Sequence, residues 1–237
     1  MHATEFEFRH RFWLLSSIFG IGFACYSVDH TNTAIALAHL LAGHHPERFA
    51  PLVRLVFWLG ALVTVACGAI RTWAAAYLAS SVVHDTELHA ERLVADGPYR
   101  HLRNPLYLGT ILLAMGLGPM ASRLGFVVLM AGIWLFTHRL ILREEGQLLR
   151  TQGESYRRYF EAVPRLIPSL RPRVAPGAGR PDWWDGIAGE AFIWGLVAGA
   201  AAFAYTLRLA WFWACMATGF AIALWQHRQM MREKSEP

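Results

Sequence analysis

The sequence has few charged residues and almost no lysine. Charged side chains make up 16% of its 237 residues, hydrophobic ones make up 55%, and Lys234 is the only lysine. Soluble globular domains carry about 25% charged residues, and the mean hydropathy of +0.30 also lies on the apolar side. The composition therefore argues against an ordinary soluble domain and predicts a polytopic membrane protein.

Cysteines are scarce as well, and neither they nor the histidines have the spacing of a metal site. Cys25, Cys67 and Cys215 lie in separate apolar segments, and the 11 histidines include no pair four residues apart beside a glutamate. We therefore predict buried thiols and no metal site. The sequence has neither a β-strand pattern nor a glycine-rich strand-to-helix fingerprint, which argues against a Rossmann-type domain. The basic segments lack interleaved aromatic residues, so we expect no nucleic-acid partner.

Six apolar runs divide the chain and predict an all-α transmembrane helical bundle of about six spans. They cover residues 12–28, 52–80, 106–118, 125–142, 187–207 and 210–226. Three parts follow from them: a first span and surface loop at 1–50, a core at 51–170, and a linker with a C-terminal transmembrane hairpin at 171–237. The linker is rich in proline between 164 and 181, and a short apolar piece at 34–43 is expected at the surface.

A polar turn precedes the third apolar run, in the stretch GPYRHLRNPLYLG. Gly97 and Pro98 predict a turn, and Pro105 predicts the start of a helix with Asn104 as its N-cap. The positive end of that helix is suited to an anion or a ligand carboxylate.

The fourth apolar run ends in Arg143, Glu144 and Glu145. The link between the third and fourth runs is so short that it predicts an antiparallel hairpin, which returns these residues to the face that holds the turn. Carboxylates at the end of a membrane helix are costly unless they are paired or solvated. We interpret turn and acids together as an active site. The alternative is a solvated helix end in which Arg139 and Arg143 neighbour the acids.

Two further segments bear on this site. Residues 147–163 are amphipathic, are interrupted at Gly153, and predict two short helices on the membrane surface. Arg71 lies late in the second apolar run, where it either snorkels to the headgroups or faces the site.

The arginine distribution predicts the orientation. Residues 139–180 contain nine arginines, whereas the loop at 29–51 has only Arg48. The positive-inside rule then places the site and both termini in the cytoplasm.

The ordered motifs resemble a family of membrane methyltransferases that includes isoprenylcysteine carboxyl methyltransferases and phospholipid methyltransferases. They are RTWA at 71–74, LVADGPY at 93–99, RNPLYLG at 103–109, REE at 143–145 with Leu148, then Gly153, Tyr156, Tyr159 and VPR at 163–165. Many members have histidine where this chain has Asn104. Asparagine forms hydrogen bonds but carries no proton at neutral pH, so an acid-base role at this position is in doubt.

The resemblance implies S-adenosyl-L-methionine as cofactor and assigns residues to two roles. The catalytic candidates are Arg71, Asn104, Glu144 and Glu145. The cofactor-binding candidates are Leu93, Val94, Gly97, Tyr99, Arg103, Asn104, Pro105, Tyr107, Gly109, Glu145 and Tyr156. Under this assignment an acid binds the ribose or the ammonium group, Arg103 or the helix start at Pro105 binds the carboxylate, and tyrosines pack on the adenine or the sulfonium.

The acceptor stays open at this point. A prenylcysteine carboxylate, a phospholipid amine and a small apolar thiol all agree with a site between cytosol and lipid. A reductase similar to the NADPH-dependent membrane sterol reductases, and a scaffold without catalytic activity, are the competing functions. The sequence leaves the oligomeric state open.

Overall fold

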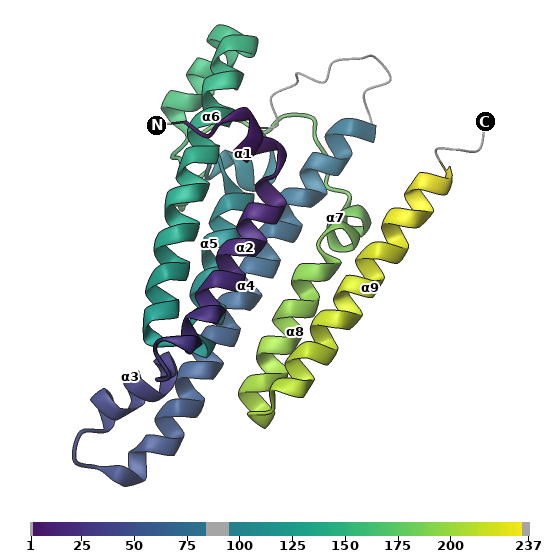
Figure 1. Cartoon of the computed structure of the whole chain (residues 1–237). Helices are drawn as coiled ribbons and strands as arrows, with labels where there is room; N and C mark the ends of the chain where they lie inside the picture. Colours follow the sequence, from purple (N-terminus) through teal and green to yellow (C-terminus); the bar gives the residue numbers. More distant parts are fainter. Residues whose placement is uncertain (1, 84–94, 234–237) are drawn as a thin grey trace.

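The protein is an elongated bundle of helices in the computed structural model, which describes residues 2–83 and 95–233. Its long helices run side by side (Figure 1). They are α2 (Arg11–Ala24), α4 (Phe49–Val83), α5 (Pro105–Leu117), α6 (Arg123–Ala162), α8 (Ala191–Thr206) and α9 (Leu209–Glu233). The described residues contain no β-strand beyond an isolated bridge between Asn32 and Ser122. The predicted all-α class is confirmed.

Short helices lie at the ends of the bundle. They are α1 (Glu5–Arg9), α3 (Thr33–Ala42), α7 (Trp183–Gly189) and four 3-10 turns, η1 (Cys25–Ser27), η2 (Pro46–Arg48), η3 (Gly97–Arg100) and η4 (Gly118–Met120). The apolar piece expected at 34–43 is α3, whose alanines Ala34, Ala38 and Ala42 are buried. Asn32 caps this helix, because its side chain accepts a hydrogen bond from the N–H of Ile35 at 3.1 Å.

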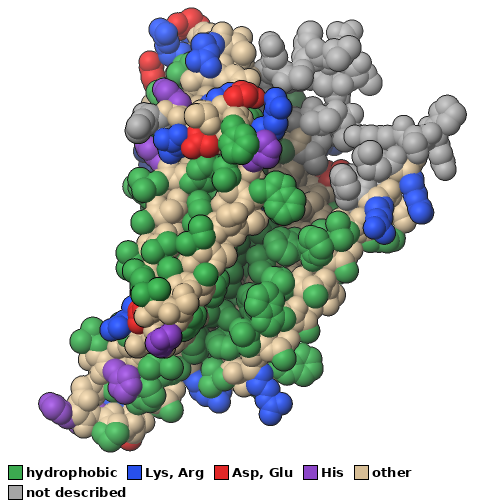
Figure 2. Space-filling view, in the orientation of Figure 1, with side chains coloured by type: hydrophobic (Ala, Val, Ile, Leu, Met, Phe, Trp, Pro, Cys, Tyr) green, Lys and Arg blue, Asp and Glu red, His purple; other side chains and the backbone are tan. Residues whose placement is uncertain are grey.

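Helix length and composition single out fewer than six candidate spans among the described residues. Among the described residues three segments are long and apolar enough to cross a membrane, Pro46–Leu78, Arg123–Ala162 and Leu209–Gln226, and the bent pair α7 and α8 makes a fourth. Helices α2 and α5 have 14 and 13 residues. At about 1.5 Å per residue they are shorter than the roughly 30 Å of a bilayer core. Hydrophobic side chains cover the middle of the face seen in Figure 2, with charged ones toward its ends, as in an integral membrane protein.

Helices α5 and α6 form the predicted antiparallel hairpin. Ser122 caps α6, because its Oγ accepts a hydrogen bond from the N–H of Gly125 at 3.0 Å. The expectation of two separate surface helices at 147–163 is wrong in one respect, since the first of them continues α6 without a break. The interruption at Gly153 is confirmed by its φ of 55° and ψ of −128°.

Close packing joins α4 and α5 at the end of the bundle away from the polar turn. A Cβ on Gly60 would lie 2.5 Å from the carbonyl oxygen of Gly116, so the two backbones meet without side chains between them. Phe57, Leu113 and Leu117 are buried in the largest hydrophobic cluster of this region. Deletion of such side chains costs about 2–5 kcal/mol each, so this packing fixes α4 and α5 relative to each other.

The proline-rich linker after α6 is irregular, as predicted, and lies along the polar turn. The N–H of Arg103 donates to the Pro164 carbonyl at 2.9 Å, and the N–H of Ser169 donates to the His101 carbonyl at 2.9 Å. Farther along, the N–H of Arg173 donates to the Arg100 carbonyl at 2.8 Å. The linker therefore covers the turn from residue 100 to residue 103.

Candidate active site

The turn at Gly97 is held between α4 and α6. Gly97 has a φ of +55°, and a Cβ there would lie 2.3 Å from the ring of Tyr77 on α4. Pro98 and Tyr99 are buried, and the hydroxyl of Tyr159 on α6 donates to the Tyr99 carbonyl at 2.8 Å. Burial raises the pKa of the Tyr99 hydroxyl, and Tyr159 beside it adds to that shift. Only glycine fits this corner, because the backbone conformation and the space both exclude a side chain.

Glu145 lies at the centre of a buried cluster that joins three segments. Its side chain is 4% exposed, and its Oε1 lies 3.1 Å from Nε of Arg103. Its Oε2 accepts a hydrogen bond from Nε of Arg165 at 3.0 Å and lies 2.8 Å from Nη2 of the same residue. Asn104 Nδ2 donates to Oε1 at 3.2 Å. Both carboxylate oxygens are therefore occupied by the protein, as a buried charge requires.

Asn104 occupies the N-cap position of α5 but does not cap the helix with its side chain. The prediction of Asn104 as the N-cap residue is confirmed, but its side-chain amide donates to Glu145 and, at 3.2 Å, to the carbonyl of Arg165 instead of capping the helix. An amide can make both bonds at once. Asn104 thus helps to position the acid rather than the first turn of α5.

Arg103 is held by several groups of the protein. Its side chain is 7% exposed, and Nη1 donates to the Phe160 carbonyl while the guanidinium carbon lies 3.9 Å above the Phe160 ring. Burial lowers the pKa of Arg103, and the neighbouring Glu145 opposes that shift. Arginine stays protonated in such surroundings, so the cluster carries two guanidinium groups around one carboxylate.

Glu144 points to a different neighbour. Successive residues of a helix project about 100° apart, so Glu144 and Glu145 face different partners. Oε1 of Glu144 accepts a hydrogen bond from the hydroxyl of Tyr107 at 2.6 Å. Its other oxygen, Oε2, has no hydrogen-bond partner among the described residues. Glu144 is only half-buried. The acid pair therefore divides into one carboxylate bound on both oxygens and one that keeps an oxygen available.

The arginines of α6 pair with the start of the chain. Arg139 Nη2 lies 2.7 Å from Oε2 of Glu7, and Arg143 pairs with Glu5 on the same short helix α1. The alternative in which these arginines neighbour Glu144 and Glu145 is therefore not what the structure shows. A hydrogen bond from the backbone N–H of Thr4 and the bond from Arg139 lower the pKa of Glu7.

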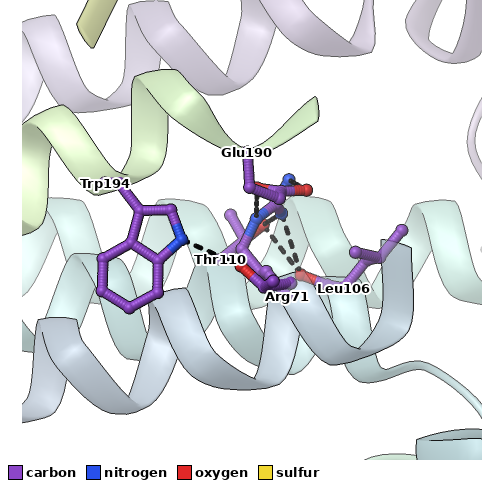
Figure 3. Close-up of polar contacts among 6 residues, drawn as sticks. Arg71, Leu106, Thr110, Glu190 and Trp194 are labelled. Atoms are coloured by element: carbon purple, nitrogen blue, oxygen red, sulfur yellow. Dashed lines mark hydrogen bonds and ion pairs between the residues drawn. The ribbon is translucent and has the colours of Figure 1, made fainter. Parts of the chain in front are cut away.

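Arg71 neither snorkels nor points freely into the site. Its Nε and Nη2 donate to the two oxygens of Glu190 at 2.7 and 2.9 Å, and Nη1 donates to the Leu106 carbonyl and to Oγ1 of Thr110, both at 3.2 Å (Figure 3). A Cβ on Gly109 would lie 2.3 Å from Cγ of Arg71. Gly109 therefore leaves room for the stem of this arginine.

Sequence reasoning missed two acidic or basic partners, Glu190 and Arg165. Glu190 is the only charged residue in the apolar stretch 187–207, and a lone charge at the start of such a run is a usable signal for a buried partner. Arg165 is the last residue of the VPR motif at 163–165, to which the sequence assigned no function. Of the other candidates, Tyr156 is 3% exposed and packs 5.8 Å from Tyr159 between ring centroids. Leu93 and Val94 lie outside the described residues.

Comparison with known families agrees with this arrangement. Residues 55–154 match the model of the phospholipid methyltransferase family. That region holds Arg71, the turn with Asn104 and Tyr107, and both acids. Residues 55–154 thus resemble the phospholipid methyltransferase family. The resemblance predicted from the motifs is confirmed.

Three curated proteins are similar to parts of this chain. The chain is 38% identical over 82 residues to the protein-S-isoprenylcysteine O-methyltransferase of Schizosaccharomyces pombe, covering 33% of this chain and 34% of that protein. It is 29% identical over 147 residues to the cobalt-zinc-cadmium resistance protein CzcN of Cupriavidus metallidurans, covering 62% and 63%. It is 23% identical over 137 residues to the nickel-cobalt-cadmium resistance protein NccN of Alcaligenes xylosoxydans xylosoxydans, covering 58% and 61%.

The matches span less than two thirds of each of these relatives. No solved structure matches the chain. The similarity to phospholipid methyltransferases covers the core of the site, whereas Arg165 and Glu190 lie beyond residue 154, outside the matched region.

Proposed function

We propose that the protein transfers a methyl group from S-adenosyl-L-methionine to a lipophilic acceptor at the cytoplasmic face of a membrane. The observation that carries the proposal is Glu144, a half-buried carboxylate held by Tyr107 with one oxygen available, inside the region related to phospholipid methyltransferases. The relative from Schizosaccharomyces pombe, an isoprenylcysteine O-methyltransferase by name, supports a methyl-transfer reaction.

The residues present fit this cofactor. S-adenosylmethionine carries an ammonium group and two ribose hydroxyls, and each can donate to Oε2 of Glu144. It also carries a carboxylate, which the free N–H groups of the first turn of α5, after Pro105, are suited to bind. Tyr107 is half-buried, so its ring is available to a sulfonium or an adenine. We assign Glu144, Tyr107 and the α5 start to cofactor contact.

The Glu145 cluster has a positioning role in this proposal. Arg103, Arg165 and Asn104 surround the acid on both oxygens and so fix the turn, the end of α6 and the linker relative to each other. Methyl transfer requires two bound molecules to be aligned, and a displacement of about 1 Å costs about 100-fold in rate. We therefore expect this cluster to act on rate through geometry.

The chemistry needs little else from the protein. When bound, S-adenosylmethionine supplies a methyl carbon that forms a bond to a lone pair of the acceptor while its bond to sulfur breaks, which leaves the neutral thioether S-adenosylhomocysteine. An acceptor that carries an N–H or S–H loses that proton to water. The turn at Gly97 is backed by three buried aromatic residues, Tyr99, Tyr156 and Tyr159, which exclude water from that side of the site.

The membrane arrangement is part of the proposal. Helices α2 and α5 run alongside the longer helices (Figure 1), so we propose that both cross together with them and that six spans result. The site end and both termini are then cytoplasmic by the arginine distribution. The division at 1–50, 51–170 and 171–237 stays a prediction, with 51–170 as the catalytic core.

Charge pairing argues against the nicotinamide-dependent reductase. Such a cofactor needs several cations for its phosphates. Five arginines around the site are each paired with a carboxylate, namely Arg71, Arg103, Arg139, Arg143 and Arg165.

Transfer of a labelled methyl group tests the proposal. Purified protein in lipid nanodiscs is incubated with methyl-labelled cofactor and a membrane lipid extract, and labelled products are identified. We expect labelled apolar product from the wild type and at least about tenfold less from Glu144→Gln, which is the loss of one charge-assisted contact. Glu154→Gln, whose side chain is 69% exposed on the same helix, is the matched control. Equal labelling by wild type and Glu144→Gln would contradict the role of Glu144.

A further inference from the structure

The guanidinium group of Arg71 binds Glu190 in the geometry with which arginine recognises any carboxylate. Nε and Nη2 form two parallel hydrogen bonds to the two oxygens, at 2.7 and 2.9 Å (Figure 3). This two-pronged arrangement is the strong and specific one for carboxylates. The remaining edge, Nη1, is used by Leu106 and Thr110 of α5. Arg71 therefore has no carboxylate-binding edge left.

This ion pair lies directly beside the candidate site. The Leu106 carbonyl that accepts from Arg71 belongs to the first turn of α5, one residue before Tyr107, which holds Glu144. The Arg71 and Glu190 side chains are 20% and 8% exposed. A ligand at the start of α5 is therefore next to a charge pair that water screens poorly.

Packing holds Glu190 in this place. It lies between α7 and α8, which are bent by 65°. One turn later, Nε1 of Trp194 donates to Oγ1 of Thr72 at 2.9 Å. A Cβ on Gly68 would lie 3.2 Å from the same indole. The start of α8 is thus fixed to α4 on both sides of Arg71.

We propose that Glu190 determines acceptor specificity: by occupying the guanidinium fork of Arg71, it restricts the enzyme to apolar acceptors with an uncharged nucleophile, an amine or a thiol, and excludes carboxylates. This inference rests on the proposed methyl transfer. It gives the C-terminal hairpin, which lies outside the region related to phospholipid methyltransferases, a part in the active site.

The physical reason is charge balance. The carboxylate of the cofactor is balanced by its own ammonium group, whereas a carboxylate acceptor would bring a further negative charge to a buried site in which one guanidinium already neutralises one carboxylate. An unpaired buried charge is strongly unfavourable, whereas an uncharged amine or thiol adds none. Exclusion by an uncompensated charge is a common way to discriminate against the wrong ligand.

The test compares two amphiphiles that differ only in charge, farnesylthioacetic acid and its amide. Their binding to full-length protein in nanodiscs is measured with labelled ligand. We expect the wild type to favour the amide by at least about tenfold. Glu190→Gln keeps the side-chain size but removes the charge, so it is expected to reverse or abolish this preference. Glu190→Asp keeps the charge and is expected to retain it, which separates charge from packing.

Glu47→Gln, a change at a side chain 65% exposed outside the site, is the matched control and is expected to behave as the wild type. If the pair of Arg71 and Glu190 had only a structural role, its loss would weaken the binding of the acid and of the amide alike and would leave their ratio unchanged. A wild type that binds the acid as well as the amide, or an unchanged ratio in Glu190→Gln, would overturn the inference. Because this binding needs no methyl donor, its outcome is independent of whether methyl transfer is observed.

Discussion

Replacement of Glu145 by alanine removes the carboxylate that pairs with the buried Arg103 and the partly exposed Arg165. The Arg103 and Glu145 side chains are 7% and 4% exposed, and Arg165 is 32% exposed. Loss of one partner from a buried ion pair costs about 3–5 kcal/mol, because the remaining charge is left without compensation. We therefore expect Glu145→Ala to destabilise the protein by that amount.

The expected size of the effect can be measured by thermal unfolding in detergent. A thiol-reactive dye reports unfolding, because the thiol of Cys67 is fully buried. A change of 1 kcal/mol shifts Tm by roughly 2–4 °C in a chain of this size, so Tm is expected to fall by roughly 6–20 °C.

The control is Glu154→Ala on the same helix. Its carboxylate pairs with Arg157 at 3.2 Å, and both side chains are more than half exposed. Such pairs contribute about 0–1 kcal/mol. If Glu145→Ala unfolded within about 2 °C of this control, the reasoning that the acid holds the site together would be refuted.

Two further predictions concern the turn and the far end of the bundle. Gly97→Ala is expected to lower Tm more than Gly153→Ala, because both glycines have a φ of +55° but only at Gly97 would a Cβ meet a ring, that of Tyr77 at 2.3 Å; equal shifts would show that the ring yields. The hydrogen bonds from Arg123 lower the pKa of Asp29, so this pair stabilises the fold above the unfolded pKa of about 3.9 and its contribution is lost as pH falls through the lower folded value. Lowering the pH from 7 to 3 should therefore reduce the free energy of unfolding more in the wild type than in Arg123→Gln. Equal decreases in the two proteins would contradict this role of the pair.

Local patterns predicted the meeting of the turn with the acids. The apolar runs and the short link between them specify an antiparallel hairpin, and a hairpin returns the chain to its starting face. The contacts of Tyr107 with Glu144 and of Asn104 with Glu145 follow from that geometry. Glycine with proline likewise predicted the corner at Gly97.

The division of labour between the two acids was not predictable from the sequence. Glu144 and Glu145 are identical in type, and which one is buried depends on where the linker returns with Arg165. That return is set by irregular backbone contacts, such as the bond from the N–H of Arg103 to Pro164, which no periodicity encodes.

Long-range ion pairs were also beyond sequence reasoning. Arg71 finds its partner Glu190 in a segment joined to it only through the whole core and linker, and Arg139 finds Glu7 at the other end of the chain. Each charge alone is compatible with snorkelling to the headgroups. The short length of α2 was not predictable for a related reason, because the apolar run at 12–28 continues past the end of the helix into a 3-10 turn.

The most direct test of the account is calorimetric titration of S-adenosylhomocysteine into detergent-solubilised protein. We predict saturable binding to the wild type, binding weakened at least about tenfold in Glu144→Ala, and unchanged binding in Glu154→Ala. NADPH is predicted to give no binding heat. Binding of NADPH in place of S-adenosylhomocysteine, or equal affinity of wild type and Glu144→Ala, would contradict the assignment of this site.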